Sequence, residues 1–589
     1  MRPPRHAVLP LPFWFMIMLC CASECLAADA ADAAQRQRCG RERMMIRGPL
    51  PTAVVREVPR KGQAATQVYT LAKEDEDDDW FPIRIKLSVR DMYDPSRHCT
   101  AAGETRIDYD GRPITCRSFD VLTEEKRDIL LKQSLPAAIK LHADRLSVKP
   151  EKGPLLIPQT SLGACNKFTI PRKHYTVGVE GVDMILYVNA FPTAGELAWA
   201  TWCAVLKDGR PFASAANFDP KAIAATNLHV RTAAHELGHA LGFISDRFLA
   251  FGMISELQNV RGKSKVTVIS SPKVKEMVRS YYNCPRLEGM ELEDEGGEGI
   301  EMSHWKKRSA VDELMSSDEG IGYYSVLTLA AFEDMGVYKA NYSMAEILWW
   351  GNNSGCGLLE KKCLTEGITD YPDLFCNKFP DDTYKLCTYD RLSLGSCNVW
   401  RYNQPLPAEY QYFANPKLGS AFKFMDICPF VEAYSNTGCK NGDSLVMPGS
   451  FIGPKSRCVK GQGLQLYDKH FGDVCVNTQC NDGTLSVQFL LDDTWYVCKE
   501  GETVAPAGEH WGGSILCPKY IDVCTDFPKI SSYPIPVVDP PLADDSSSSE
   551  GSEEEDEGSG SSSSVSAFLV FAPLGVLVLS AAAVAMSFL

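Results

Sequence analysis

The chain has 589 residues, of which 45% are hydrophobic and 23% are charged. This composition excludes a disordered protein and supplies enough apolar side chains for two or three hydrophobic cores. The formal net charge of −15 comes mostly from two acidic runs, with six acids in residues 74–79 and eight in 544–557, so the remaining chain is nearly neutral. No basic patch indicates a nucleic-acid partner, and both acidic runs are typical of solvated linkers.

The first residues have the pattern of a secretory signal peptide, which we place at residues 1–27. Arg2 and Arg5 precede an apolar run, and small residues follow it at a plausible cleavage point. Residues 28–80 have little apolar periodicity and end in the first acidic run. We interpret them as a propeptide.

Cysteine usage agrees with export. The chain has 22 cysteines, and eighteen remain once the three in the signal peptide and Cys39 in the propeptide are set aside. Eighteen can form nine disulfides in an oxidising compartment, although their pairing cannot be deduced. Most of them lie in residues 356–530 among glycine, proline and asparagine turns, which predicts a disulfide-rich C-terminal domain.

Between the propeptide and residue 252 the pattern mixes strands and helices. Residues 83–89 alternate as a strand does, and residues 184–188 read as a buried strand. A long amphipathic helix is expected to open at Thr123 and to run as far as Leu146.

The stretch from Val230 to Phe243 contains a His-Glu-x-x-His motif. On an α-helix, His235 and His239 share a face and can bind one Zn²⁺, with Glu236 one step round the helix. Asn227 is a candidate N-cap, and Gly242 can adopt the positive φ that ends a helix. His229 lies off the ligand face, which favours a core or surface role.

Two histidines make an incomplete site, so a third ligand must come from elsewhere. The compact metzincin motif needs a histidine where this chain has Ser245, which excludes that form. His304 is the preferred candidate because Met315 follows it in a run that resembles a Met-turn. The alternative is a thermolysin-like site in which Glu256 is the third ligand. The later His470 and His510 are isolated and read as structural or surface residues.

These features together resemble the leishmanolysin family, peptidase family M8. The similarity runs from about residue 83 to residue 524 and includes Leu197-Ala-Trp-Ala-Thr-Trp-Cys203, Gly322-Tyr-Tyr-Ser and Trp350-Gly-Asn-Asn-Ser-Gly-Cys356. The resemblance implies an α+β fold. Its parts would be a metzincin-like N-terminal domain (81–252) with a mixed twisted sheet and the active-site helix, a helical central domain (253–355) and the cysteine-rich domain.

The expected chemistry is zinc-dependent peptide hydrolysis with one zinc ion per chain, held by His235, His239 and His304. Glu236 is the predicted general base, and Met315 is expected to support the site from below. Ser317 stands where some metzincins have a tyrosine near the oxyanion, so carbonyl polarisation is expected to come mainly from zinc. The resemblance implies extended polypeptides as substrates.

A substrate of that kind commonly adds as a further strand to the edge of the catalytic sheet. The expected edge strand lies just before the zinc helix and consists of Phe212, Ala213, Ser214, Ala215, Ala216 and Asn217.

Cys39 is the odd thiol and is flanked by several arginines, which would lower its pKa. Because a thiolate is a strong zinc ligand, we hypothesise that Cys39 blocks the metal until the propeptide is cut. Family precursors look similar but usually carry histidine before Arg-Cys, where this chain has Gln37.

The C-terminal end predicts attachment to the outer leaflet of the plasma membrane. A Pro/Ser/Glu-rich stalk (531–564) precedes an uncharged apolar tail (565–589), which resembles a GPI signal with attachment near Ser559. A transmembrane helix is the alternative. Asn341 and Asn352 begin N-glycosylation sequons.

The sequence therefore predicts a cell-surface zinc endopeptidase that is made as a zymogen, with an adhesion role implied by the resemblance. The competing function is a cysteine-rich surface adhesin whose protease domain has lost activity. The intact set of His235, Glu236, His239 and His304 argues against that alternative.

Overall fold

The computed structural model describes residues 79–524 apart from positions 110, 160, 161, 194, 298, 319 and 380–383. The predicted signal peptide, nearly all of the propeptide with Cys39, the stalk, Ser559 and the apolar tail lie outside these residues. The predicted domain boundaries remain predictions.

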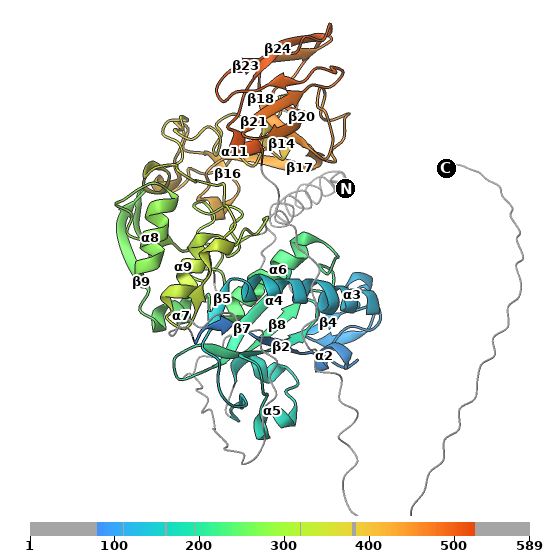
Figure 1. The fold of residues 1–589 in the computed structure, drawn as a ribbon, viewed down its shortest axis with the longest axis vertical. Helices are drawn as coiled ribbons and strands as arrows, with labels where there is room; N and C mark the ends of the chain where they lie inside the picture. Colours follow the sequence, from blue (N-terminus) through green and yellow to red (C-terminus); the bar gives the residue numbers. More distant parts are fainter. Residues whose placement is uncertain are drawn as a thin grey trace, which may run out of the picture. The chain divides into compact units, whose positions relative to one another are not determined.

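A four-stranded mixed sheet lies next to the helix that carries His235 and His239 (Figure 1). Its strand order is β2-β6-β8-β7. Strands β2 (Ile85–Ser88), β6 (Met184–Asn189) and β8 (Pro211–Phe218) run parallel, and β7 (Ala198–Val205) pairs antiparallel with β8. The structure confirms the two strands expected at residues 83–89 and 184–188.

Both faces of this sheet are covered, as the unbroken burial of β6 requires. Met184, Leu186 and Val188 belong to the core shared with the helices, whereas Ile185 and Tyr187 belong to a second core on the other face. The helical face is covered by α6 (Asn227–Ala240), which packs on β7 and β8, and by α4 (Leu135–Ala143), which packs on α6 (Figure 1). Helix α6 is thereby held between the sheet and another helix.

The segment 212–217 is not an edge strand, so that prediction is wrong. Strand β8 pairs with β6 on one side and with β7 on the other, and all of its residues are buried. Within the described residues, β7 ends the sheet. Sequence order misled the prediction because β7 precedes β8 in the chain but lies outside it in the sheet.

The long helix expected from Thr123 is interrupted and shorter. It consists of α3 (Glu124–Asp128), a π-helical turn (Ile129–Ser134) and α4, and it ends at Ala143. Leu146 starts strand β5 (Leu146–Val148), which pairs with β1 (Phe81–Pro82) and β12 (Lys339–Ala340). An apolar residue at the position of Leu146 fits either a helix or a strand, and Leu146 is in a strand because β5 pairs with β1 and β12.

The region expected as a helical central domain also contains a sheet. Strands β9 (Ile254–Val260), β10 (Lys263–Ile269) and β11 (Met290–Glu291) form it in the order β11-β10-β9. Helices α8 (Pro272–Tyr281) and α9 (Val326–Asp334) pack on each other. The expectation of a helical region was therefore only partly right.

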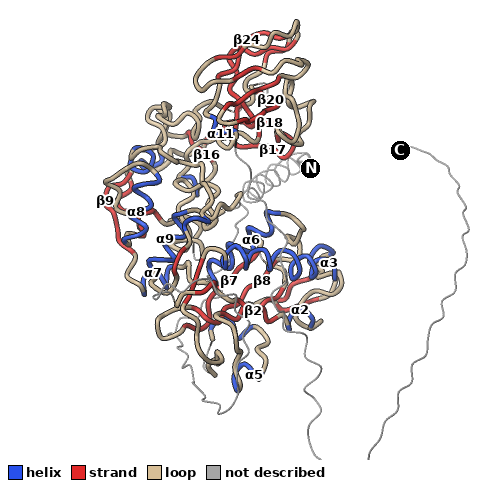
Figure 2. Tube along the Cα trace, viewed as in Figure 1, coloured by secondary structure: helices blue, strands red, loops and turns tan. Residues whose placement is uncertain are grey.

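The cysteine-rich region consists mainly of strands and loops (Figure 2). Its sheets are β13-β14-β17, β15-β16 and a seven-stranded sheet in which β22-β21-β20-β18-β24-β23 are joined by β19. The strands are β13 (Leu386–Cys387), β14 (Ser393–Cys397), β15 (Val399–Arg401), β16 (Leu418–Ser420), β17 (Val431–Gly438), β18 (Ser456–Leu466), β19 (Lys469–His470), β20 (Val474–Asn481), β21 (Thr484–Gln488), β22 (Tyr496–Val497), β23 (Thr503–Val504) and β24 (Trp511–Leu516).

The remaining elements are short. They are α2 (Arg90–Tyr93), β3 (Thr105–Ile107), β4 (Pro113–Thr115), α5 (Arg172–Thr176), α7 (Ser245–Ala250), α10 (Gly357–Glu360) and α11 (Tyr520–Val523).

Nine disulfides join all eighteen cysteines of the described region, which confirms the predicted number. The pairs are Cys99–Cys116, Cys165–Cys203, Cys284–Cys356, Cys363–Cys428, Cys376–Cys397, Cys387–Cys458, Cys439–Cys475, Cys480–Cys524 and Cys498–Cys517. Most of them crosslink the cysteine-rich region, where hydrophobic cores are smaller.

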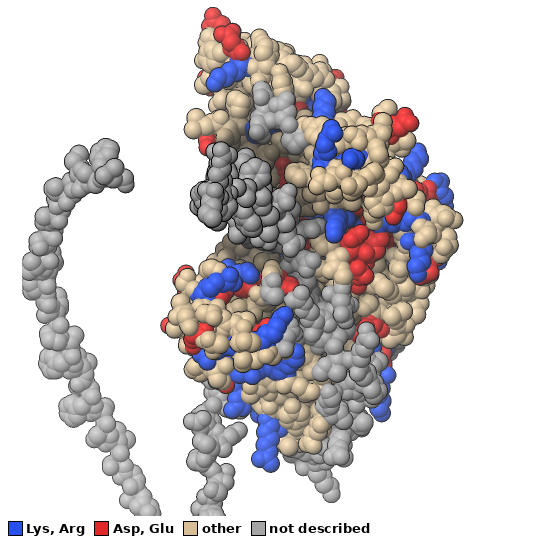
Figure 3. Space-filling view, turned by 180° about the vertical axis from the view of Figure 1, so that it is seen from behind, with Lys and Arg blue, Asp and Glu red and all other residues tan. Residues whose placement is uncertain are grey.

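On the face shown in Figure 3, lysine and arginine are interspersed with aspartate and glutamate among uncharged residues. Within the part of the chain that the structure describes, no helix has both the length and the apolar character needed to cross a bilayer.

Candidate active site

Three buried histidines meet at one point although they are far apart in the sequence. His235 and His239 lie on α6, and His304 lies on a loop after β11. The Nε2 atoms of the three rings are all 3.1 Å from one another, and none of the side chains is exposed. The structure therefore places His304 beside the helical pair.

The other nitrogen of each ring bonds to a backbone carbonyl. Nδ1–H of His235 donates to Leu314 O at 2.6 Å, that of His239 to Phe243 O at 2.8 Å, and that of His304 to Ile300 O at 2.9 Å. Since a carbonyl only accepts, Nδ1 carries the proton in each neutral ring and Nε2 presents a lone pair. Three lone pairs therefore converge.

This donor set fits a zinc ion. Imidazole nitrogens bind Zn²⁺ at about 2.0–2.1 Å, and three protein ligands are typical of a catalytic rather than a structural zinc site. Nitrogens 3.1 Å apart can reach one ion together, and the three histidines form a group that could hold a metal. The carbonyl bonds fix the ring orientations that such binding needs.

Helix α6 has its own start and stop signals. The N-cap is Thr226, not the expected Asn227, because the Thr226 side chain accepts a bond from the His229 amide at 3.2 Å. At the other end Gly242 has a φ of 106°, and the Phe243 amide donates to Gly238 O at 2.9 Å. Glu236 lies between the two histidines in sequence and is fully buried.

Met315 lies directly beneath this helix, at Gly238. A Cβ added at Gly238 would lie 2.5 Å from the Met315 sulfur, so only glycine leaves room for this side chain. Met315 is fully buried, and its carbonyl accepts a bond from the Trp305 amide at 2.9 Å. Gly238 is therefore a packing requirement of the site that sequence reasoning missed.

The turn around Met315 is organised by a buried carboxyl group, Glu313. It accepts bonds from the Met315 amide (2.5 Å), the Ser325 hydroxyl (2.7 Å) and the Thr328 hydroxyl (2.6 Å). Burial raises the pKa of Glu313 to about 7, although these hydrogen bonds by themselves lower the pKa. In the sequence, only the position of Glu313 two residues before Met315 could have indicated its role in this turn. Ser317 is buried and donates to Glu293 at 2.7 Å, so its hydroxyl is engaged within the protein.

Other candidate residues lie outside the three-histidine group. Glu256 lies on exposed strand β9 and forms an ion pair with Lys265 at 2.5 Å, so it is not the third ligand. His229 is buried, and its ring bonds to the Ser134 hydroxyl at 2.7 Å. His470 and His510 are both exposed.

The comparisons with known proteins agree with this geometry. The profile of peptidase family M8, leishmanolysin, matches residues 29–532. The chain belongs to the leishmanolysin family. It is 37% identical to leishmanolysin of Leishmania major over 485 residues, covering 79% of each chain. Leishmanolysin of Leishmania tropica is 36% identical, covering 79% of this chain and 72% of that protein.

A more distant relative is the leishmanolysin-like peptidase of Drosophila melanogaster, which is 25% identical over 587 residues and covers 75% of this chain and 85% of that protein. As a member of the leishmanolysin family, the chain is a metalloendopeptidase. The family is one of zinc metallopeptidases, and His235, His239 and His304 are the residues here that could form the metal site.

Proposed function

We propose that this leishmanolysin-family chain hydrolyses polypeptides with one zinc ion held by His235, His239 and His304. The observation that carries the proposal is the convergence of three Nε2 lone pairs at 3.1 Å separations in a fully buried position. Such an arrangement is electrostatically unfavourable without a cation, and three histidine ligands leave a further position for water or substrate.

In this mechanism a bound zinc ion supplies Lewis-acid activation of a water molecule and of the scissile carbonyl. Glu236 accepts the proton that the attacking water gives up and later delivers it to the leaving amine nitrogen. Glu236 is fully buried and follows His235 directly on α6, so its carboxylate belongs to the same enclosed site as the three histidines. The backbone carbonyls that hold the three rings keep the lone pairs aligned through both steps.

An extended substrate would add to the sheet at β7. This strand pairs with β8 along one side and ends the sheet within the described residues, so its other side can offer backbone groups to a peptide. Strand β8, the earlier candidate, has both sides occupied.

Metal content and proteolysis measured together test the proposal. In the secreted full-length protein after activation, His304→Ala should lose bound zinc and casein cleavage. Glu256→Ala is the matched control and should keep both, because its carboxylate pairs with Lys265 on an exposed strand. Equal zinc content in the two variants would contradict the assignment of His304.

We also propose that Cys39 keeps the precursor inactive by binding the zinc in place of water. The support is chemical, namely a thiol flanked by arginines in a segment that precedes the catalytic region. Cys39→Ala should give casein cleavage without processing of the propeptide. If the unprocessed Cys39→Ala precursor cleaves casein no faster than the wild-type precursor, the proposal is wrong.

We further propose that the mature enzyme is glycosylated and anchored at the cell surface by GPI. Asn341 and Asn352 are exposed, as glycosylation acceptors must be. A phosphoinositide-specific phospholipase should release the protein from cells, and retention after treatment would favour a transmembrane tail instead.

A further inference from the structure

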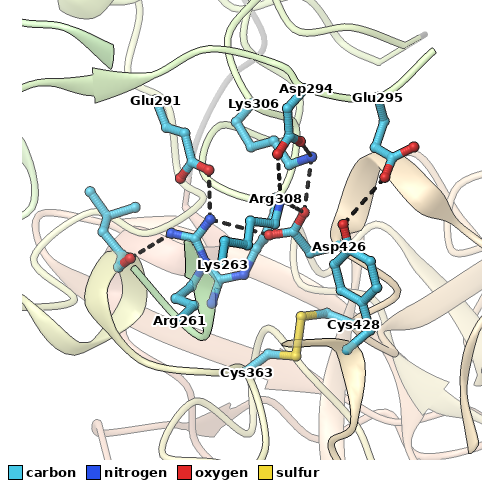
Figure 4. A network of polar contacts seen from close by, with 12 residues as sticks. Arg261, Lys263, Glu291, Asp294, Glu295, Lys306, Arg308, Cys363, Asp426 and Cys428 are labelled. Carbon is cyan, nitrogen blue, oxygen red and sulfur yellow. Dashed lines mark hydrogen bonds and ion pairs between the residues drawn. A yellow bond between two sulfur atoms is a disulfide. The ribbon is translucent and has the colours of Figure 1, made fainter. Parts of the chain in front are cut away.

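A buried cluster of charged side chains includes Lys306, which follows His304 by two residues in the sequence (Figure 4). It contains equal numbers of cations and anions, so its formal charge is zero. Its members are Arg261, Lys263, Lys306, Arg308, Glu291, Glu293, Asp294 and Asp426, and all of them except Asp294 are buried. Seven of the members form ion pairs with one another, whereas Arg308 bonds to the backbone carbonyls of Leu358 and Lys361. Buried charges persist only when they are paired or hydrogen-bonded, so the ion-paired members depend on one another.

The cluster joins three separate parts of the chain. Arg261 and Lys263 stand at the turn between β9 and β10, Lys306 follows His304 by two residues, and Asp426 belongs to the cysteine-rich region. Asp426 Oδ1 accepts from Lys263 Nζ at 2.7 Å and lies 2.9 Å from Lys306 Nζ, and its Oδ2 accepts from Arg261 at 3.2 Å. Figure 4 shows these contacts meeting at Asp426.

Asp426 is held in place by its own neighbourhood. Its φ is 53°, its amide donates to Lys423 O at 2.8 Å, and its carbonyl accepts from the Tyr412 hydroxyl at 2.5 Å. Two residues later, Cys428 forms a disulfide with Cys363. Burial by itself would raise the pKa of the Asp426 carboxyl group, but the nearby cations, Lys306 first among them, hold this pKa well below its usual range. Asp426 is therefore a fixed negative charge.

Lys306 connects this charge to the third histidine. Its ammonium group is fully buried and also pairs with Glu293 at 2.6 Å. The Glu293 amide donates to His304 O at 2.9 Å, and the Lys306 amide donates to Glu291 O at 2.9 Å. The backbone on both sides of His304 thus depends on where Lys306 and its partners lie.

We propose that Asp426 is a positioning residue for the third zinc ligand. Its carboxylate is one of three that pair with Lys306, beside those of Glu293 and Asp294. By balancing the buried positive charge there, it holds the loop around His304 in place, so that the His304 Nε2 remains aligned with those of His235 and His239. If Asp426 lost its charge, the buried cluster would hold one excess cation. The loop would then shift to hydrate Lys306 and would carry His304 with it. This inference rests on the proposed function, because alignment of His304 matters only if the three histidines bind zinc.

The test is the zinc affinity of Asp426→Asn in the full-length protein, measured by competition with a chromogenic chelator. Loss of an outer partner of a metal ligand typically weakens metal binding about 10–100-fold, and we expect about tenfold here. The matched control is Asp183→Asn. Asp183 is also a buried carboxylate, paired with Arg84 at 2.9 Å, but it does not belong to the cluster. This control should lower the melting temperature and leave zinc affinity unchanged.

The double variant Asp426→Asn/Lys306→Met removes one anion and one cation, so the cluster stays neutral. It should bind zinc nearly as tightly as the wild type, and it also serves if the single variant does not fold. The inference is overturned if Asp426→Asn binds zinc within about twofold of wild type. It is also overturned if Asp183→Asn weakens zinc binding as much as Asp426→Asn does. A double variant whose zinc affinity is about tenfold below that of the wild type would overturn it as well. If the wild type itself binds no zinc, the proposed function fails instead.

Discussion

At the scale of single residues, the site depends on the carboxyl group of Glu236 and on the absence of a side chain at Gly238. Glu236 is buried and lies between His235 and His239 in the sequence, a position that suits the proposed proton transfer. Gly238, on the same helix, has no side chain, and Met315 occupies the space that a Cβ would fill. Neighbouring positions of one helix therefore serve chemistry and packing respectively.

Replacing Glu236 with glutamine should remove proteolysis and leave zinc in place. Glutamine has the same shape but cannot take a proton from water, and a general base contributes about 10²–10⁴-fold to the rate. The measurement is the kcat for casein cleavage beside the zinc content of the same sample. A variant that keeps more than about a tenth of wild-type kcat would rule out Glu236 as the base. Survival of any adhesive function in this variant would separate adhesion from catalysis.

Gly238→Ala should destabilise the protein although alanine favours helices. The new methyl group would meet the Met315 sulfur at 2.5 Å, and overpacking of this kind costs about 1–3 kcal/mol. Urea unfolding should show the loss in the wild-type background. In a Met315→Ala background, where the space is empty, the same substitution should have little effect or stabilise. A stabilising effect in both backgrounds would contradict the packing argument.

At the scale of elements, His142 connects α4 to α6. Its Nε2–H donates to Ala234 O at 2.8 Å, so Nδ1 accepts from the Tyr324 hydroxyl at 3.1 Å. Burial lowers the pKa of His142 to about 4, although the Ala234 carbonyl acts in the opposite direction. The neutral ring is therefore part of the packing between the two helices.

This lowered pKa predicts a loss of stability in acid. Below the unfolded-state pKa of about 6.5, the unfolded chain binds a proton at His142 that the folded protein does not bind until about pH 4. The free energy of unfolding should therefore fall by about 3 kcal/mol between these pH values because of this residue. Denaturant unfolding of wild type and His142→Gln across the interval gives the difference. Glu313, with its raised pKa, has the opposite dependence but is common to both proteins. Parallel pH profiles would contradict the prediction.

At the scale of the whole molecule, the cysteine-rich region is joined to the preceding part of the chain by the ion pairs of Asp426 and by the Cys284–Cys356 disulfide. A second disulfide, within the cysteine-rich region, holds the turn that carries Asp426. The Cys363–Cys428 disulfide spans a sequence separation of 65 residues and lies next to Asp426. Replacing both cysteines with alanine should cost about 2–4 kcal/mol, because the unfolded chain gains freedom. It should also weaken zinc binding if Asp426 positions His304.

A matched control is the Cys498–Cys517 disulfide, which has a separation of 19 residues and lies outside the charged cluster. Its removal should lower the melting temperature and leave zinc affinity unchanged. Melting curves and chelator competition on both variants make the comparison. Equal zinc affinity in the two variants would show that the Cys363–Cys428 disulfide acts on stability alone.

The sequence by itself determined the features that depend on local geometry. A His-Glu-x-x-His motif places two histidines on one helical face because residues four apart share that face. Alternating apolar residues were enough to find β2, and a continuous apolar run was enough to find β6. The cysteine count gave the number of disulfides. Each of these follows from the residues within a short stretch or from composition alone.

Only the tertiary structure decided which distant residues meet. It placed His304 rather than Glu256 beside the helical pair, put β7 rather than β8 at the sheet edge, and brought Asp426 to Lys306. It also fixed which cysteines pair. The physical reason is that contacts between residues far apart in the chain are selected by the packing of whole elements, which local periodicity does not encode.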